Sequence, residues 1–94
     1  MMISIDEIKK IININAMEES SISDLYSEIA TVAEIGIEES KSIVRHVLAQ
    51  MIDDTTVGIY QYSNDTDSTS GLVEVSLDEA LANAVNSYVF STST

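Results

Sequence analysis

The sequence predicts a mainly helical α+β domain, and three features of its 94 residues point to that class. Apolar residues recur at helical spacing through three segments of the first half of the chain. A run of β-branched and aromatic residues follows at 57–62, and a second, shorter apolar run lies at 72–75. We find no internal repeat and no linker that would divide the chain, so we expect one domain over residues 1–94.

The first predicted helix begins at a capping box in which Ser4 precedes Glu7 by three positions. One face of this helix is apolar, with Ile5, Ile8, Ile12 and Ala16 at spacings of three and four. We expect the helix to end at about Met17, because Glu18 and Glu19 follow. Carboxylates there oppose the negative end of the helix dipole.

Two further helices are predicted before residue 57. Ile22 is expected to form a short bridge or strand, and Ser23 to cap a second helix that ends at Gly36. A third helix begins near Ile37 and has the most regular helical period in the chain. Its apolar stripe contains Ile43, Val44, Val47, Leu48, Met51 and Ile52.

The second half of the chain predicts a hairpin and a final helix. The runs at 57–62 and 72–75 are expected to pair around a polar wing loop at 63–71. Ser76 and Glu79 form another capping box. The apolar residues after it predict a helix that continues to about Val89, followed by a disordered tail at 91–94.

The net charge of the chain indicates which class of molecule it can bind. Sixteen acidic residues against four basic ones give a formal net charge of −12, which favours a cationic partner and disfavours direct contact with nucleic acid. The absence of cysteine excludes disulfides and thiolate metal sites. The N-terminus lacks a signal-peptide pattern and no apolar run approaches about 20 residues, so we expect a cytoplasmic protein without membrane contact.

The order of the predicted elements resembles the winged-helix group of helix-turn-helix folds, over residues 23–62 and 72–81. A DNA-binding winged helix carries basic or polar side chains along its third helix and wing. Here the third helix begins with Glu38 and Glu39, and its cationic or nearly cationic residues are Lys41, Arg45 and His46. The resemblance therefore implies a winged-helix fold, while the acidic residues of the third helix argue against sequence-specific binding to DNA.

In its small size, acidity and lack of catalytic motifs, the chain is similar to the cytoplasmic immunity proteins encoded beside bacterial toxins, including contact-dependent growth-inhibition systems. This resemblance implies a protein that binds and blocks one cognate toxin domain, often a basic nuclease. Two alternatives stay open. One is an inhibitor that mimics the charge of DNA, and the other is a winged-helix regulator or interaction module that binds DNA through Lys41 and Arg45.

The candidate partner-binding residues are acidic or aromatic. Carboxylates at the C-terminal ends of helices break a local rule, which makes them candidates for function. Two tyrosines alternate along the wing strand, so they share one face of it. Either both point outward as interface anchors, or one of them packs against the last helix near Tyr88. The predicted residues are Glu18, Glu19, Asp53, Asp54, Tyr60, Tyr62, Asp65 and Asp67.

No catalytic, cofactor or metal site is predicted. His46 is four residues from Ser42, but no orienting group completes a nucleophile–base set, so we expect a binding protein rather than an enzyme. Asp65 and Asp67 fail the EF-hand pattern, because serine occupies its sixth and twelfth positions. Repulsion between two chains of charge −12 favours a monomer or a hetero-complex over a homodimer.

Overall fold

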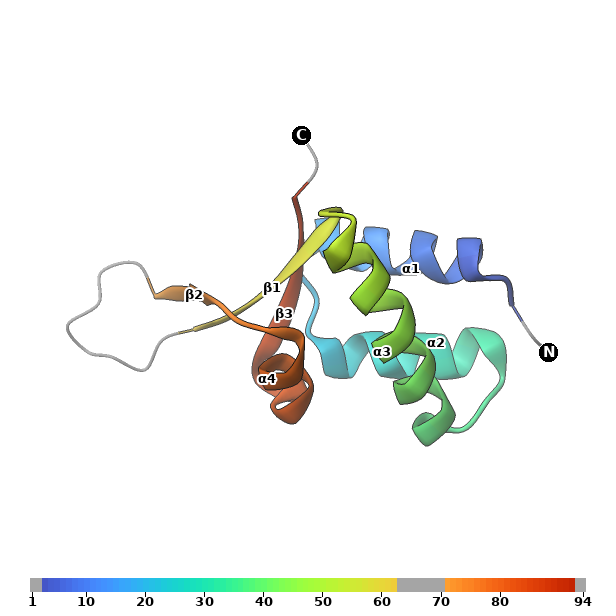
Figure 1. Cartoon of the computed structure of the whole chain (residues 1–94). Helices are drawn as coiled ribbons and strands as arrows, with labels where there is room; N and C mark the ends of the chain where they lie inside the picture. The colour runs from blue at the N-terminus through green and yellow to red at the C-terminus, as the bar shows by residue number, and fades with distance from the viewer. Residues whose placement is uncertain (1–2, 63–70, 93–94) are drawn as a thin grey trace.

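A computed structural model describes residues 3–62 and 71–92, which form a mainly helical, winged-helix-like α+β fold (Figure 1). This confirms the predicted class, with three helices, a β-hairpin wing and a short C-terminal helix. The elements in order are α1 (Ile5–Met17), α2 (Ile22–Ala33), α3 (Ile37–Asp53), β1 (Val57–Tyr62), β2 (Leu72–Glu74), α4 (Leu77–Ala82), the 3₁₀ turn η1 (Ala84–Asn86) and β3 (Ser87–Ser91).

A serine caps the start of α1, α2 and α4. The hydroxyls of Ser4 and Ser76 accept the backbone N–H groups of Glu7 and Glu79, which is one of the two hydrogen bonds of each predicted capping box. The prediction for α2 was wrong, because its N-cap is Ser21 rather than Ser23. Ile22 is therefore the first residue of the helix, and its side chain is fully buried. The predicted bridge does occur one residue earlier, between Ser21 and Tyr88.

Each of the three long helices ends in a left-handed residue that is not glycine. Glu19, Glu34 and Thr55 have φ values of 54°, 57° and 58°. In all three cases backbone N–H groups bond back to the last turn in the Schellman pattern. Helix α2 thus ends at Ala33 rather than at Gly36, which instead serves as the N-cap of α3 with φ −71°.

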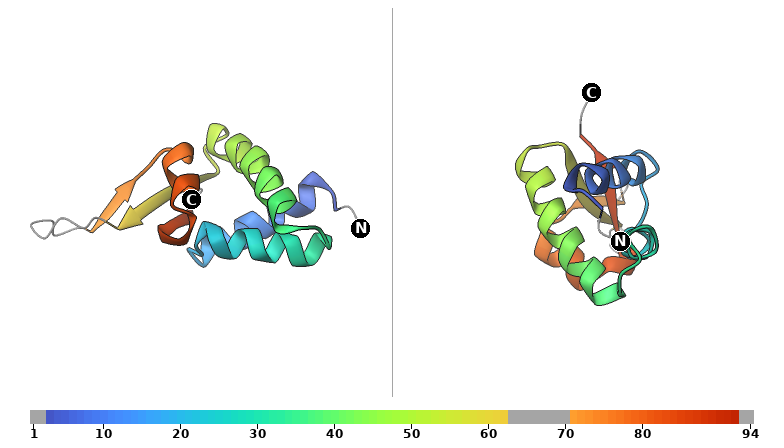
Figure 2. Two further views of the ribbon diagram at one scale, coloured as in Figure 1. Left: turned by 90° about the horizontal axis from the view of Figure 1, so that it is seen from below. Right: turned by 90° about the vertical axis from the view of Figure 1, so that its right-hand side faces the viewer.

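The core lies where the helices meet one face of the sheet. It is almost entirely aliphatic, and Ile12, Leu25, Ile29, Leu48, Val44, Ile59 and Val89 are among its fully buried members. The β1–β2 hairpin extends away from the three long helices in both Figure 1 and Figure 2. The wing therefore keeps apolar side chains in solvent, since Leu72 and Val73 are about half exposed.

The sheet corrects the predicted end of the chain. Its three antiparallel strands have the order β2-β1-β3, so the segment expected to complete a helix returns as a strand. Helix α4 stops at Ala82 because Asn83 leaves helical geometry, at φ −137° and ψ 58°. Val89 is then fully buried opposite Ile59. The expected tail also begins too early, because Ser91 belongs to β3.

Candidate functional site

The strand register divides the sheet into two different faces. Val57, Ile59 and Val89 lie on the face that packs on the helices, and all three are buried. Side chains opposite each other in an antiparallel pair share a face, so the second face carries the alternate residues. This second face holds four of the five aromatic residues of the chain: Tyr60, Tyr62, Tyr88 and Phe90. We call these four residues the aromatic face.

Tyr60 lies at the centre of the aromatic face. Its ring centroid is 5.4 Å from that of Tyr88 in a stacked arrangement, 5.6 Å from that of Tyr62 and 5.8 Å from that of Phe90. These separations are the range in which aromatic pairs attract. Gly58 makes room for the Phe90 ring, because a Cβ at Gly58 would lie 2.5 Å from Phe90 Cζ.

An open groove runs beside the aromatic face, between the end of α1 and the wing. Its volume is about 460 Å³, and we call it the α1–sheet groove. Apolar side chains make up much of its lining, and two of them, Met17 and Leu72, are 77% and 50% exposed. The described lining residues are Ala16, Met17, Glu19, Tyr60, Leu72, Glu74, Phe90 and Ser91.

Glu19 and Tyr60 are joined by a hydrogen bond in this groove. The Tyr60 hydroxyl donates to Glu19 Oε1 over 2.9 Å. Burial raises the pKa of Tyr60 well above its ordinary value, and the Glu19 carboxylate and the Tyr62 hydroxyl raise it further. The second carboxylate, Glu74, is exposed on β2 directly opposite Tyr60 in the register. The groove therefore combines a largely apolar lining with two acidic side chains.

The structure brings together only part of the predicted site. Glu19 and Tyr60 line the groove, whereas the exposed Glu18 beside them does not. Asp53 and Asp54 are exposed at the end of α3 and also lie outside its lining. Asp65 and Asp67 fall outside the described residues.

The two predicted tyrosines differ in exposure. Tyr62 is 59% exposed, as expected of an outward residue. Tyr60 is only 7% exposed and its ring stacks on that of Tyr88, which is the alternative in which one tyrosine packs near Tyr88. Tyr60 itself is covered on both sides of the sheet, by the core behind β1 and by the neighbouring aromatic rings. Tyr88 lies in β3 rather than in the expected helix, and Phe90 was not among the predicted site residues, although the alternation of both with Ser87, Val89 and Ser91 is a strand signal.

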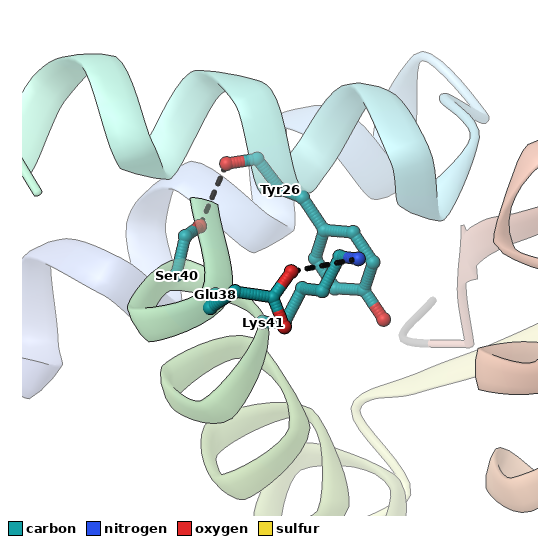
Figure 3. A network of polar contacts seen from close by, with 4 residues as sticks. All are labelled: Tyr26, Glu38, Ser40 and Lys41. Atoms are coloured by element: carbon teal, nitrogen blue, oxygen red, sulfur yellow. Dashed lines mark hydrogen bonds and ion pairs between the residues drawn. The ribbon is translucent and has the colours of Figure 1, made fainter. Parts of the chain in front are cut away.

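The cations of α3 are engaged within the chain. Lys41 Nζ lies 3.3 Å from Glu38 Oε2 and 5.9 Å from the ring centroid of Tyr26 (Figure 3). Arg45 is 3.7 Å from Asp78 at the start of α4. These exposed pairs are weak, but they place a carboxylate beside each cation that a DNA-binding role would use.

His46 lies beside Gln50 on α3. Its Nε2 atom lies 3.3 Å from Gln50 Nε2, and the side chain is exposed. Within residues 3–62 and 71–92, no group of three or more His, Asp or Glu side chains is placed to hold a metal ion. In the same ranges, no helix has both the length and the apolar character needed to cross a bilayer.

The α1–sheet groove offers apolar contact area and the carboxylates of two glutamates. No family model, curated protein or solved structure matches this chain.

Proposed function

We propose that this protein is an inhibitor that binds a basic protein domain, and that the domain is a toxin of the nuclease class. One observation carries the proposal: apolar and aromatic side chains line the α1–sheet groove together with the carboxylates of Glu19 and Glu74. Interfaces are built from such combinations, in which buried aromatic and apolar anchors give affinity and flanking charges select the partner.

The charge of the whole chain supports a nuclease as the partner. A nuclease must be positive where it holds nucleic acid, so a protein of net charge −12 is complementary to that surface. Long-range attraction speeds the encounter of the two proteins. Once the two proteins have met, the apolar part of the groove supplies the contacts that slow their dissociation.

The two alternatives account for fewer of the features. A mimic of DNA charge needs carboxylates alone, and it gives no role to the exposed Met17 and Leu72 beside the aromatic face. A DNA-binding regulator needs cations on α3, where Lys41 and Arg45 each have a carboxylate partner. Duplex binding in a gel-shift assay at low salt would favour the regulator.

The test uses the basic domain encoded nearest to this chain's own coding sequence. Association and dissociation rates are measured by surface binding at about 0.02 M and about 0.15 M salt, together with cleavage of plasmid DNA by the domain. We expect cleavage to be blocked, and the association rate to fall at least about tenfold at the higher salt. Unblocked cleavage, or an association rate that ignores salt, would overturn the proposal.

Charge reversal supplies the matched control. Glu19→Lys together with Glu74→Lys changes the groove, whereas Asp53→Lys together with Asp54→Lys makes the same change in charge at the C-terminal end of α3, outside the groove lining. We expect the groove pair to slow association and speed dissociation. The control pair is expected to slow association alone, because it alters the long-range field without touching the contact.

A further inference from the structure

We infer that the α1–sheet groove is a binding site for an arginine side chain of the partner. This inference rests on the proposed function and names the group that the groove recognises. Three properties of the groove select a guanidinium: an oriented carboxylate, a half-buried aromatic ring beside exposed apolar side chains, and two carboxylates with no cation among the described lining residues.

The carboxylate of Glu19 is held in place for such a contact. Tyr60 donates to Oε1 over 2.9 Å and so restricts the rotation of the side chain. A carboxylate has about four acceptor positions, so a single bond from Tyr60 leaves room for a paired contact. Arginine presents two parallel N–H groups to a carboxylate, and the planar fork matches its geometry.

The floor of the groove suits the rest of an arginine side chain. The half-buried ring of Phe90 lines the groove 5.8 Å from the buried ring of Tyr60, and it offers aromatic surface to a planar cation. Met17 and Leu72 offer apolar contact to the methylene groups of the stem. A lysine would gain less, because its ammonium is more strongly hydrated and cannot stack.

The groove also has an unbalanced charge. Among the described residues that line it, two are carboxylates, Glu19 and Glu74, and none is a cation. The Lys41 and Arg45 side chains pair with Glu38 and Asp78 instead. An arginine from a partner would therefore be the cation that balances this groove.

The probe is the blocked tripeptide acetyl-Gly-Arg-Gly-amide, titrated into the isotopically labelled full chain and followed by NMR. The control peptide carries citrulline, which keeps the shape of arginine but has no charge. We expect saturable shifts confined to the groove residues, with a dissociation constant on the order of millimolar for so small a ligand. The citrulline peptide is expected to bind at least about fivefold more weakly.

Two single substitutions separate a local contact from general attraction. Glu19→Gln keeps an acceptor for the Tyr60 hydroxyl but removes the charge, and we expect it to weaken arginine binding at least about fivefold. Glu18→Gln makes the same change one residue away, outside the groove, and should leave binding within about twofold. The inference is overturned if both peptides bind alike, if both variants behave alike, or if the shifts spread over the acidic surface.

The same variants distinguish the two proposals. If the basic domain still binds with a steep salt dependence while Glu19→Gln has no effect, the arginine site is wrong and the proposed function stands. If neither the peptide nor the domain binds, both are wrong.

Discussion

At the scale of single residues, the hydrogen bond from Tyr60 to Glu19 links the aromatic face to the acidic edge of the groove. The ring of Tyr60 is buried, while the carboxylate that it contacts is exposed. One residue thus contributes to packing through its ring and to the site through its hydroxyl. This dual role is measurable, because it changes the ionisation of Tyr60.

The first prediction concerns pH. The folded protein raises the pKa of Tyr60 above the ordinary value of 10.0, through burial first and Glu19 second. The folded state therefore holds this proton more tightly than the unfolded chain does. The resulting stabilisation is complete below pH 10.0 and is lost as the pH rises above it. We expect the free energy of unfolding of the wild type to fall above pH 10.0, and that of Tyr60→Phe to fall less steeply.

Chemical denaturation at neutral pH and above pH 10.0 measures this difference. Glu19→Gln serves as the control, since it keeps the acceptor and removes the negative charge. We expect tyrosinate absorbance to show Tyr60 in this variant ionising closer to its ordinary range. If the wild type and Tyr60→Phe lost the same free energy of unfolding above pH 10.0, the buried Tyr60 hydroxyl and its hydrogen bond to Glu19 would not stabilise the folded state.

Among the helices and strands, the elements that the sequence predicts correctly are those whose signals lie close together in the chain. The capping serines of α1 and α4 and the period of α3 lie within a few residues of each other, so the sequence contains them directly. Strand β3 depends instead on pairing with β1, about 30 positions earlier in the chain. Its apolar residues also fit a helical period, and only the distant partner decides between the two structures.

The second prediction tests how β1 and β3 fit together. Alanine in a strand is ordinarily more favourable than glycine by about 0.5–1 kcal/mol. At Gly58 the added Cβ would lie 2.5 Å from Phe90 Cζ, so the ring must move. We expect Gly58→Ala to destabilise the protein by about 1–3 kcal/mol.

A double-mutant cycle supplies the control. In a Phe90→Ala background the obstructing ring is absent, so Gly58→Ala should become neutral or stabilising. The two substitutions are therefore expected to be coupled, which urea denaturation of the four proteins would measure. Additive effects would mean that the Phe90 ring does not determine which side chains are tolerated at position 58.

At the scale of the whole molecule, the site arises where distant segments meet. The α1–sheet groove takes residues from the end of α1 and from all three strands. Glu19 and Tyr60 were both predicted, but for unrelated reasons, and the sequence does not indicate that they touch. Glu74 and Phe90 join them through the register of the sheet. The sequence therefore predicts the acidic and aromatic chemistry of the site, while tertiary structure decides which residues form it.

The last prediction concerns salt, which should affect the free protein and its complex in opposite directions. A net charge of −12 on 94 residues repels itself, so screening relieves an unfavourable term in the folded state. We expect the free energy of unfolding to rise by on the order of 1 kcal/mol between low and physiological salt. Thermal melts of the free protein measure this gain.

A variant with fewer exposed carboxylates serves as the comparison for this salt-induced rise in the free energy of unfolding. Glu18→Gln, Asp53→Asn and Asp54→Asn together remove three charges that lie outside the groove lining. The combined variant should gain less stability from salt than the wild type, yet still bind the arginine peptide. Association with a basic domain should weaken over the same range of salt, because screening reduces the attraction between the two proteins. In the free chain, screening instead reduces the repulsion among its own carboxylates. A parallel response of folding and binding to salt would contradict this electrostatic account of the molecule.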